Sequence, residues 1–265
     1  MAILTFNSAA AGLGGGTFGE SFVFAEDSIV TGIFINSTGT KLWMVGSQND
    51  NVYAYTFGTP WDVSTLTYDN DFLDVSSEDG IPTGIWFKSD GTEAYVTGSL
   101  GDEINTYTLS TAWDISTGTY SATDSITTNT DNPSRPFFNA TGTKMFIVDQ
   151  SSGAVPDTID EYSLSIAWDM ATLTYVGMWA NPTSDFIGGV SFNSTGTKMY
   201  IPDTSTDFVY EYNLSVAWDL STAIQVSALD ISTEQSSAGA PFIKTDNSKM
   251  IISGQSPSGV FGYDL

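Results

Sequence analysis

The sequence predicts an all-β fold, a five-bladed β-propeller with four antiparallel strands in each blade. Three observations support this prediction. A turn with glycine or asparagine at its centre recurs at intervals of 51 to 54 residues, at Gly39, Gly91, Gly142, Gly196 and Asn247. A tyrosine followed by a Trp-Asp pair and Ser/Thr recurs four times, at residues 55–65, 107–117, 162–172 and 212–222. Self-similarity at a fixed period indicates repeated structural units, and no stretch has the periodicity of an amphipathic helix.

Each unit contains short strand-like segments in the same order. The first precedes the turn and is apolar on both faces, as in a strand buried on both sides; it lies at residues 33–35, 85–87, 136–138, 190–192 and 241–243. The second follows the turn, at residues 42–45, 94–96, 145–148, 199–201 and 250–252. The third ends in the recurrent tyrosine, and the fourth follows Trp-Asp, for example at residues 118–126. Four strands in each such unit are typical of a propeller blade.

The fifth unit supplies only three strands, because the sequence ends at Leu265. Residues 17–34 match the region between a Trp-Asp turn and the next unit, so residues 18–24 are predicted to supply the missing outer strand. Pairing the two ends of the chain in one blade closes the ring and leaves fewer unpaired strand edges. An alternative is that "ILTF" at residues 3–6 supplies this strand. The predicted organisation is a flexible N-terminal arm at residues 1–16 and a single propeller domain at residues 17–265.

The repeat resembles the YVTN-like and NHL-like β-propeller repeats. The resemblance rests on an apolar strand, a turn such as "NSTGTK" at residues 36–41, a strand such as "MFIV" at residues 145–148 and a "V-x-x-Y-x-L" strand, and it covers residues 17–265. The added "AWD" element, followed by a hydrophobic residue and Ser/Thr, is similar to a repeat in predicted propeller proteins of marine bacteria and their phages. The resemblance implies the propeller fold, and such repeats occur in structural, adhesive and enzymatic proteins.

Composition excludes several classes of partner and site. The net charge of −24 creates a field that repels phosphate backbones and anionic lipid headgroups, so neither nucleic acid nor a membrane is an expected partner. Without cysteine, neither a disulfide framework nor a thiolate metal site can form. The N-terminus lacks the basic and apolar regions of a secretory signal, and no segment is long and apolar enough to be a transmembrane helix. The expected location is a virion or the extracellular space.

A Trp-Asp pair recurs at one position of four blades. These residues and Trp179 are the candidate ligand-binding residues: Trp61, Asp62, Trp113, Asp114, Trp168, Asp169, Trp218 and Asp219. The first interpretation is structural, because an indole can pack against the neighbouring blade while the aspartate accepts backbone N–H groups in a turn. The alternative is a ring of shallow pockets for neutral glycans, in which indole faces stack on sugar rings. Trp43 and Trp86 are expected in the core, and Trp179, late in an outer strand or in its loop, is the aromatic residue expected to be exposed.

Catalysis would have to proceed without histidine or cysteine, which removes the commonest general base and thiol nucleophiles. Two carboxylates could still hydrolyse a glycosidic bond, and by analogy of fold some five-bladed propellers are glycosidases with acidic residues at the central channel. The innermost predicted strands carry few acids, so no catalytic residue is assigned and no cofactor is expected. Acidic clusters at residues 47–51, 69–74 and 76–79 could bind Ca²⁺, but none has the EF-hand spacing, and solvated loop acids explain them better.

A non-enzymatic structural or attachment module is the predicted function. Its favoured form is a phage virion protein that decorates a capsid or a tail. Four features support it: no secretion signal, an acidic exterior, no catalytic constellation, and an arm that could add a strand to a neighbouring subunit. Other subunits of a larger assembly are therefore the expected partners, bound through the arm. A soluble lectin-like propeller that binds neutral glycans is the alternative, and a propeller glycosidase comes third.

Overall fold

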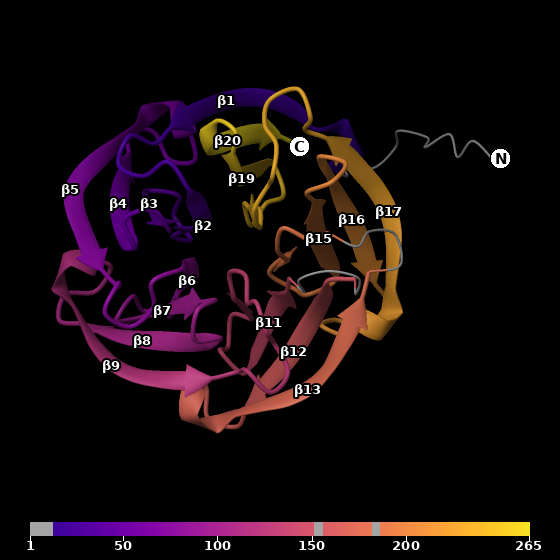
Figure 1. Ribbon diagram of the computed structural model, residues 1–265. Coiled ribbons are helices and arrows are strands. Elements are labelled where there is room, and N and C mark those ends of the chain that lie inside the picture. The colour runs from indigo at the N-terminus through magenta and orange to yellow at the C-terminus, as the bar shows by residue number, and fades with distance from the viewer. Residues whose placement is uncertain (1–12, 151–155, 182–185) are drawn as a thin grey trace.

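The computed structural model describes residues 13–150, 156–181 and 186–265. Five four-stranded antiparallel sheets are arranged in a ring around a common centre (Figure 1). The predicted five-bladed β-propeller is confirmed, and the only helices in the described ranges are single turns of 3₁₀-helix. Of the predicted arm, residues 1–12 lie outside the described residues, and so does the alternative strand at residues 3–6.

The first four blades are each built from four consecutive strands, with the innermost strand first. Blade 1 contains β2 (Val30–Ile35), β3 (Lys41–Gly46), β4 (Asn51–Phe57) and β5 (Leu66–Asp74). Blade 2 contains β6 (Pro82–Phe87), β7 (Glu93–Gly98), β8 (Glu103–Leu109) and β9 (Gly118–Ser125). Blade 3 contains β10 (Phe137–Phe138), β11 (Lys144–Asp149), β12 (Thr158–Leu164) and β13 (Leu173–Ala180). Blade 4 contains β14 (Ser191–Phe192), β15 (Lys198–Asp203), β16 (Phe208–Leu214) and β17 (Ala223–Asp230).

The N-terminal strand completes blade 5, as predicted. This strand, β1 (Thr17–Val23), pairs antiparallel with β20 (Ser258–Asp264), and the sheet continues through β19 (Lys249–Gln255) to β18 (Phe242–Ile243). Figure 1 shows β1 on the outer rim of the ring beside β20. The two ends of the described chain therefore form one sheet, and backbone pairing closes the ring.

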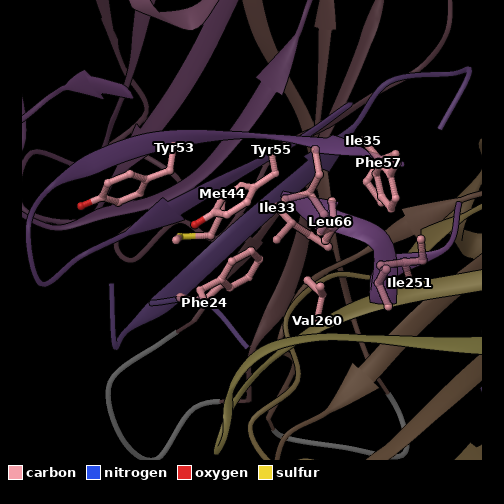
Figure 2. Packing of buried hydrophobic residues seen from close by; sticks show 13 residues of the cluster. Phe24, Ile33, Ile35, Met44, Tyr53, Tyr55, Phe57, Leu66, Ile251 and Val260 are labelled. Atoms are coloured by element: carbon pink, nitrogen blue, oxygen red, sulfur yellow. The ribbon is translucent and has the colours of Figure 1, made fainter. Parts of the chain in front are cut away.

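The core lies between neighbouring blades, and Figure 2 shows the part of it at the ring closure. Ile251 and Val260 of blade 5 belong to the same buried cluster as Ile33 and Tyr55 of blade 1. Phe24, which directly follows β1, is buried in this cluster, with its ring centroid 4.9 Å from that of Tyr55. Burial of apolar side chains therefore stabilises the closure in addition to strand pairing.

The recurrent tyrosine connects each third strand to the loop that leads into the innermost strand of its own blade. The Tyr55 hydroxyl donates to Glu26 Oε2 at 2.5 Å, and the Tyr107 hydroxyl donates to Glu78 Oε2 at 3.0 Å. The other three blades repeat the contact with different partners: Tyr162 with Thr130, Tyr212 with Asn181, and Tyr263 with Glu234. A buried phenol with a hydrogen-bonded hydroxyl explains why this residue recurs in every blade.

The described part of the N-terminal arm packs on blade 4. Residues Leu13–Gly15 form a turn of 3₁₀-helix, η1, that contacts β16 and β17. The Leu13 side chain is buried, and its N–H donates to Glu211 Oε2 at 2.8 Å. Burial alone would raise the pKa of Glu211, but hydrogen bonds from Lys198, the Leu13 N–H and Ser227 lower it. Within the described residues, contacts with the propeller therefore already include Leu13, four residues before the predicted domain boundary.

A buried carboxyl in blade 3 makes stability depend on pH. Asp160 is 1% exposed; its Oδ2 accepts a hydrogen bond from Thr130 Oγ1 at 2.6 Å, and its Oδ1 accepts one from Thr158 Oγ1 at 3.3 Å. Burial raises the pKa of Asp160 from 3.8 to about 6. Because the folded state holds this proton more tightly than the unfolded chain, the stability contributed by the protonated form is complete below pH 4 and is lost as the pH rises through 6.

Replacing this carboxyl is expected to stabilise the protein at neutral pH. Asp160→Asn should raise the free energy of unfolding by about 1–3 kcal/mol at pH 8 and change it little at pH 4, because the amide carries no charge to desolvate. Urea unfolding at the two pH values measures the difference. Asp230→Asn is the opposite control, because hydrogen bonds from the Ser232 hydroxyl and N–H lower the pKa of Asp230, and its loss should reduce stability at pH 8. Equal stability of Asp160→Asn and the parent at pH 8 would contradict the prediction.

Candidate functional site

The four recurrent tryptophans cover the glycine turns of their own blades. Each has a positive φ of 66° to 68°, and the N–H of Trp218 donates to the Gly196 carbonyl at 2.9 Å. A Cβ atom at Gly196 would lie 2.2 Å from the Trp218 ring, so only glycine fits beneath it. The ring also stacks on Phe146 of the preceding blade, with centroids 6.1 Å apart and planes inclined by 18°. The contact of the ring with the glycine recurs at Trp61 over Gly39, Trp113 over Gly91 and Trp168 over Gly142. Stacking on the preceding blade recurs for Trp113 on Phe34 and for Trp168 on Tyr95.

The aspartates of the Trp-Asp pairs act as N-caps of short 3₁₀-helices. Oδ1 of Asp62 accepts hydrogen bonds from Ser64 N at 3.1 Å and from Ser64 Oγ at 2.6 Å. In blade 3, where alanine replaces serine, Asp169 still accepts from Ala171 N at 3.2 Å. The caps begin η2 (Val63–Thr65), η3 (Ile115–Thr117), η4 (Met170–Thr172) and η5 (Leu220–Thr222), and their aspartates are Asp62, Asp114, Asp169 and Asp219. These contacts give the pairs a role in the turn, and a ligand-binding role for them stays a prediction.

Two of the candidate positions have distinct surroundings. Trp168 and Asp169 line a groove of about 380 Å³ between blades 2 and 3, together with Lys88, Glu93 and Asp124. Trp179, predicted to be an exposed aromatic residue, is half-buried, with its ring edge-on to Tyr212 at 5.6 Å between centroids. Its position in β13 brings it against the third strand of blade 4, which covers much of the ring.

The innermost strands bring one residue from each blade to the centre of the ring. Four of these residues are aromatic and one is serine: Phe34, Trp86, Phe137, Ser191 and Phe242. The Trp86 ring centroid lies 5.1 Å from that of Phe34, 4.9 Å from that of Phe137 and 5.9 Å from that of Phe242. These side chains meet although they are about 50 residues apart in successive repeats. Ser191 leaves the aromatic ring incomplete at blade 4.

The innermost strands surround the central channel of the propeller, and a pocket of about 240 Å³ opens at the end of the channel where these aromatic side chains lie. We call this pocket the aromatic vestibule. Its walls are Phe34, Trp86, Phe137, Phe192 and Phe242, with Arg135 and Ser191 at its base. Turn residues Ser37, Ala140, Ser194 and Thr245 form its rim and are exposed, so the pocket communicates with solvent. Trp86, expected in the core, is half-buried because it faces this pocket.

Two residues before each of the five central residues, the backbones of neighbouring blades come into close contact. A Cβ atom at Gly32 would lie 2.8 Å from Gly84 Cα, and one at Gly84 would lie 2.2 Å from Arg135 Cα. One at Gly189 would lie 2.5 Å from Ala240 Cβ. Arg135 is therefore the one long side chain at this level, and it extends to the aromatic ring.

The guanidinium of Arg135 fills the gap left by Ser191. Its Nη2 donates to Ser191 Oγ at 2.9 Å and to the Pro241 carbonyl at 3.4 Å. The guanidinium carbon lies 5.3 Å from the Trp86 ring centroid and 4.6 Å from that of Phe242, within cation–π range. Nε and Nη1 are buried and have no hydrogen-bond partner among the described residues. Burial lowers the pKa of Arg135 to about 9, so the group remains protonated at neutral pH.

The opposite end of the channel is a polar vestibule of about 270 Å³. It is lined by residues that precede the aromatic ring on the innermost segments or lie in neighbouring loops: Thr31, Thr83, Ser134, Gln150, Thr204 and Gln255. Several of these side chains connect blades, since Thr31 Oγ1 donates to the Pro82 carbonyl at 2.8 Å and Gln150 Nε2 donates to the Ile187 carbonyl at 2.9 Å. These two side chains of the polar vestibule are thus engaged in inter-blade contacts.

Neither a metal centre nor a spanning helix is found in the described part of the chain. No group of three or more Asp, Glu, His or Cys side chains there is placed to hold a metal ion. Ca²⁺ binding in the acidic loops therefore stays an untested prediction. None of the helices in the described ranges has the length and apolar character needed to cross a membrane.

Sequence reasoning missed the aromatic vestibule and its arginine. Trp86 was assigned to the core by alignment with Phe34, Phe137 and Phe242, which does not reveal that these side chains face a shared pocket. A signal was present at Arg135, because it is the only arginine in the sequence and occupies a position where the other repeats have glycine or alanine. Ser191, at a position that is aromatic in the other four repeats, was the second signal.

No protein-family model matches the sequence, and the comparison with curated proteins found no match. Solved structures with a similar fold include a protein assigned as a 6-phosphogluconolactonase from Bacteroides uniformis, at 12% identity and a TM-score of 0.50, with 76% of this chain and 57% of that chain covered. The β-propeller domain of Cps50 (Swd1) from Myceliophteria thermophila is similar at 10% identity and a TM-score of 0.51, over 94% and 99% of the two chains. Luciferin-regenerating enzyme is similar at 12% identity and a TM-score of 0.53, over 93% and 80%.

These likenesses show the fold alone. The chain spans a little over half the length of the Bacteroides uniformis protein, so nothing about that protein's activity transfers directly. The five-bladed propeller is thus established by the structure, whereas the specific resemblance to YVTN-like, NHL-like or marine phage repeats finds no match and stays a prediction.

The predicted virion or attachment function is contradicted by these comparisons. The similar structures named above include a lactonase-assigned protein and luciferin-regenerating enzyme, and none of those named is described as a virion, glycan-binding or glycosidase protein. The physical reason for the error is that net charge and composition do not specify function, which depends on individual sites that differ between proteins of one fold. The predicted lack of enzymatic activity is likewise not supported, because the fold is shared with enzymes. A virion or extracellular location is not shown, and partner subunits are untested.

Proposed function

We propose that this propeller binds a compact organic molecule in the aromatic vestibule. The observation that carries the proposal is a solvent-connected pocket with aromatic walls, a polar rim that includes Lys244, and the Arg135 guanidinium and Ser191 hydroxyl at its base. Concave, mostly apolar sites with a small number of positioned polar groups are the usual form of small-molecule sites. The volume of about 240 Å³ is below the ~300–1,000 Å³ of drug-sized pockets, so the ligand is expected to be small.

The exposure of the walls supports binding over simple packing. Trp86 and Phe242 are half-buried, although both lie at the centre of the propeller, where the other large side chains are mostly buried. Covering these rings with an apolar ligand would remove their remaining surface from water, which is favourable by about 25 cal/mol for each Å² buried. A ligand with a flat apolar body matches the planar walls.

A substitution at the rim tests the proposal. Ser194→Trp places an indole at the mouth of the aromatic vestibule and is expected to weaken binding of benzamide at least tenfold, because the indole competes for the same walls. Binding is followed by ligand-observed NMR titration, with dissociation constants expected on the order of 0.1–10 mM for so small a molecule. The matched control is Ser89→Trp, at the equivalent exposed turn position of blade 2, which does not line the pocket. Equal weakening by both variants, or none by Ser194→Trp, would contradict the proposal.

Hydrolysis of a lactone is the second candidate, favoured by the lactonase assignment of the Bacteroides uniformis structure. Against it, the described residues that line the aromatic vestibule include no Asp or Glu that could act as a general base. Acid release from δ-gluconolactone above the uncatalysed rate, lost in Ser194→Trp and kept in Ser89→Trp, would support hydrolysis in this pocket. A rate equal to the uncatalysed one would leave binding as the function.

A further inference from the structure

We propose that the aromatic vestibule is selective for small organic anions and that the Arg135 guanidinium binds their carboxylate. This inference rests on the proposed function, because it specifies the ligand class of the same pocket. Three observations carry it. Arg135 forms no ion pair with any described carboxylate, two of its guanidinium nitrogens have no described hydrogen-bond acceptor, and the pocket walls contain aromatic but no acidic side chains.

Arg135 differs from all six lysines of the protein. Each of the six lysines forms an ion pair with a carboxylate: Lys41 with Asp69, Lys88 with Glu93, Lys144 with Glu161, Lys198 with Glu211, Lys244 with Asp246, and Lys249 with Glu20. Arg135 is more deeply buried than any of them, at 2% exposed, and has no ion pair within the described ranges. Although the chain contains 31 acidic residues, none of the described ones forms an ion pair with the arginine in the channel.

The guanidinium has N–H donors that are not used in hydrogen bonds to described residues. Ser191 and Pro241 accept from Nη2 alone, which leaves the N–H groups of Nε and Nη1 without a described partner. A buried cation with unpaired donors is costly, and an anion placed beside it offsets that cost by charge-assisted hydrogen bonds. A neutral ligand of the same shape would supply weaker hydrogen bonds and no charge.

The walls of the pocket favour an anion with a flat apolar body. No described residue that lines the aromatic vestibule is acidic, so an anion inside it meets no like charge at contact distance. Trp86 and Phe242 flank the guanidinium with their rings, and both rings line the aromatic vestibule together with Arg135. A planar carboxylate such as benzoate can therefore contact the rings and Arg135 together. The net charge of −24 acts at longer range, where salt screens it.

The competing interpretation is that Arg135 only fills the space at Ser191 and stabilises the ring through Trp86 and Phe242. Under that interpretation the pocket does not distinguish a carboxylate from an amide of the same shape. Benzoate and benzamide are therefore the matched pair of ligands, because they differ mainly in charge.

The single arginine makes the test direct. In a ¹H–¹⁵N spectrum of the ¹⁵N-labelled full chain, the Nε–H signal of Arg135 is the only arginine signal of its kind. Titration with benzoate is expected to shift this signal in a saturable manner with an affinity at least tenfold higher than that of benzamide. Arg135→Met is expected to remove that preference, whereas Lys88→Met, an equal change of charge outside the aromatic vestibule, is expected to change the benzoate affinity less than threefold.

The outcomes separate this inference from the proposed function. Binding of both ligands with equal affinity, abolished by Ser194→Trp, would overturn the anion selectivity and leave the pocket as a binding site. Binding of neither ligand would overturn both proposals. If Arg135→Met does not fold, the ratio of affinities and the Nε–H shift in the parent protein still decide the question. A preference for benzoate that persists in folded Arg135→Met would also overturn the role of Arg135.

Discussion

Truncation to residues 26–265 is expected to abolish cooperative thermal unfolding, whereas truncation to residues 13–265 is expected to preserve it. The shorter chain lacks β1, so the whole of β20 becomes an unpaired edge, and strand edges of this kind promote association. It also lacks Leu13 and Phe24, which are buried against blade 4 and blade 1, respectively.

The size of this effect follows from the side chains that are lost. Truncating a buried phenylalanine or leucine typically costs about 2–5 kcal/mol, and the entire stability of a domain is about 5–15 kcal/mol. The truncation removes Phe24, Leu13, the ion pair between Lys249 and Glu20, and one whole strand. The summed loss is therefore expected to equal or exceed the free energy of unfolding of the domain. Differential scanning calorimetry and size-exclusion chromatography measure the outcome.

Addition of a synthetic peptide of residues 13–25 provides the control for specific closure. If the missing strand is the cause, the peptide should restore a cooperative transition in the 26–265 chain by pairing with β20. A truncated chain that melts like the parent, without peptide, would contradict the closure of the ring by β1.

Gly196→Ala is expected to lower the free energy of unfolding by about 3 kcal/mol or more. The turn requires φ of +68°, which costs a non-glycine residue about 1–2 kcal/mol, and the new Cβ would lie 2.2 Å from the Trp218 ring. The ring must then leave its stacked position on Phe146, so the contact between blades 3 and 4 is lost as well. Gly177→Ala is the control, because an added Cβ there meets nothing within 4 Å and φ is not positive, so the change should stay within about 1 kcal/mol.

A double-mutant cycle tests the cause. Trp218→Ala alone should cost about 3–5 kcal/mol, and adding Gly196→Ala to it should cost at least about 1 kcal/mol less than Gly196→Ala costs in the parent, because the clash is gone. Blade 5 supports this coupling, since it has no Trp-Asp pair and carries Asn247, with φ of 57°, in place of the glycine. Additive effects of the two substitutions would show that ring and turn are independent.

The sequence by itself determined the number of blades, the order of their strands and the closure. Each of these depends on contacts within one repeat or on a repeat being incomplete, and such features are visible in a window of a single unit. The turn role of the aspartates that follow Trp61, Trp113, Trp168 and Trp218 was predicted for the same reason, because a local turn specifies it. The tryptophans were predicted to pack on the neighbouring blade, and their contact with the glycine turn of their own blade was not predicted.

Only the tertiary structure decided what the channel contains. The innermost strands contribute one residue from each blade, so Arg135 of blade 3, Ser191 of blade 4 and Trp86 of blade 2 meet although no local pattern connects them. Arg135 occupies the space that Ser191 leaves, and a compensation between different blades has no signature in either repeat alone. The pocket and the guanidinium at its base are brought together because five strands converge on one axis, and that convergence sets which side chains share the centre of the ring.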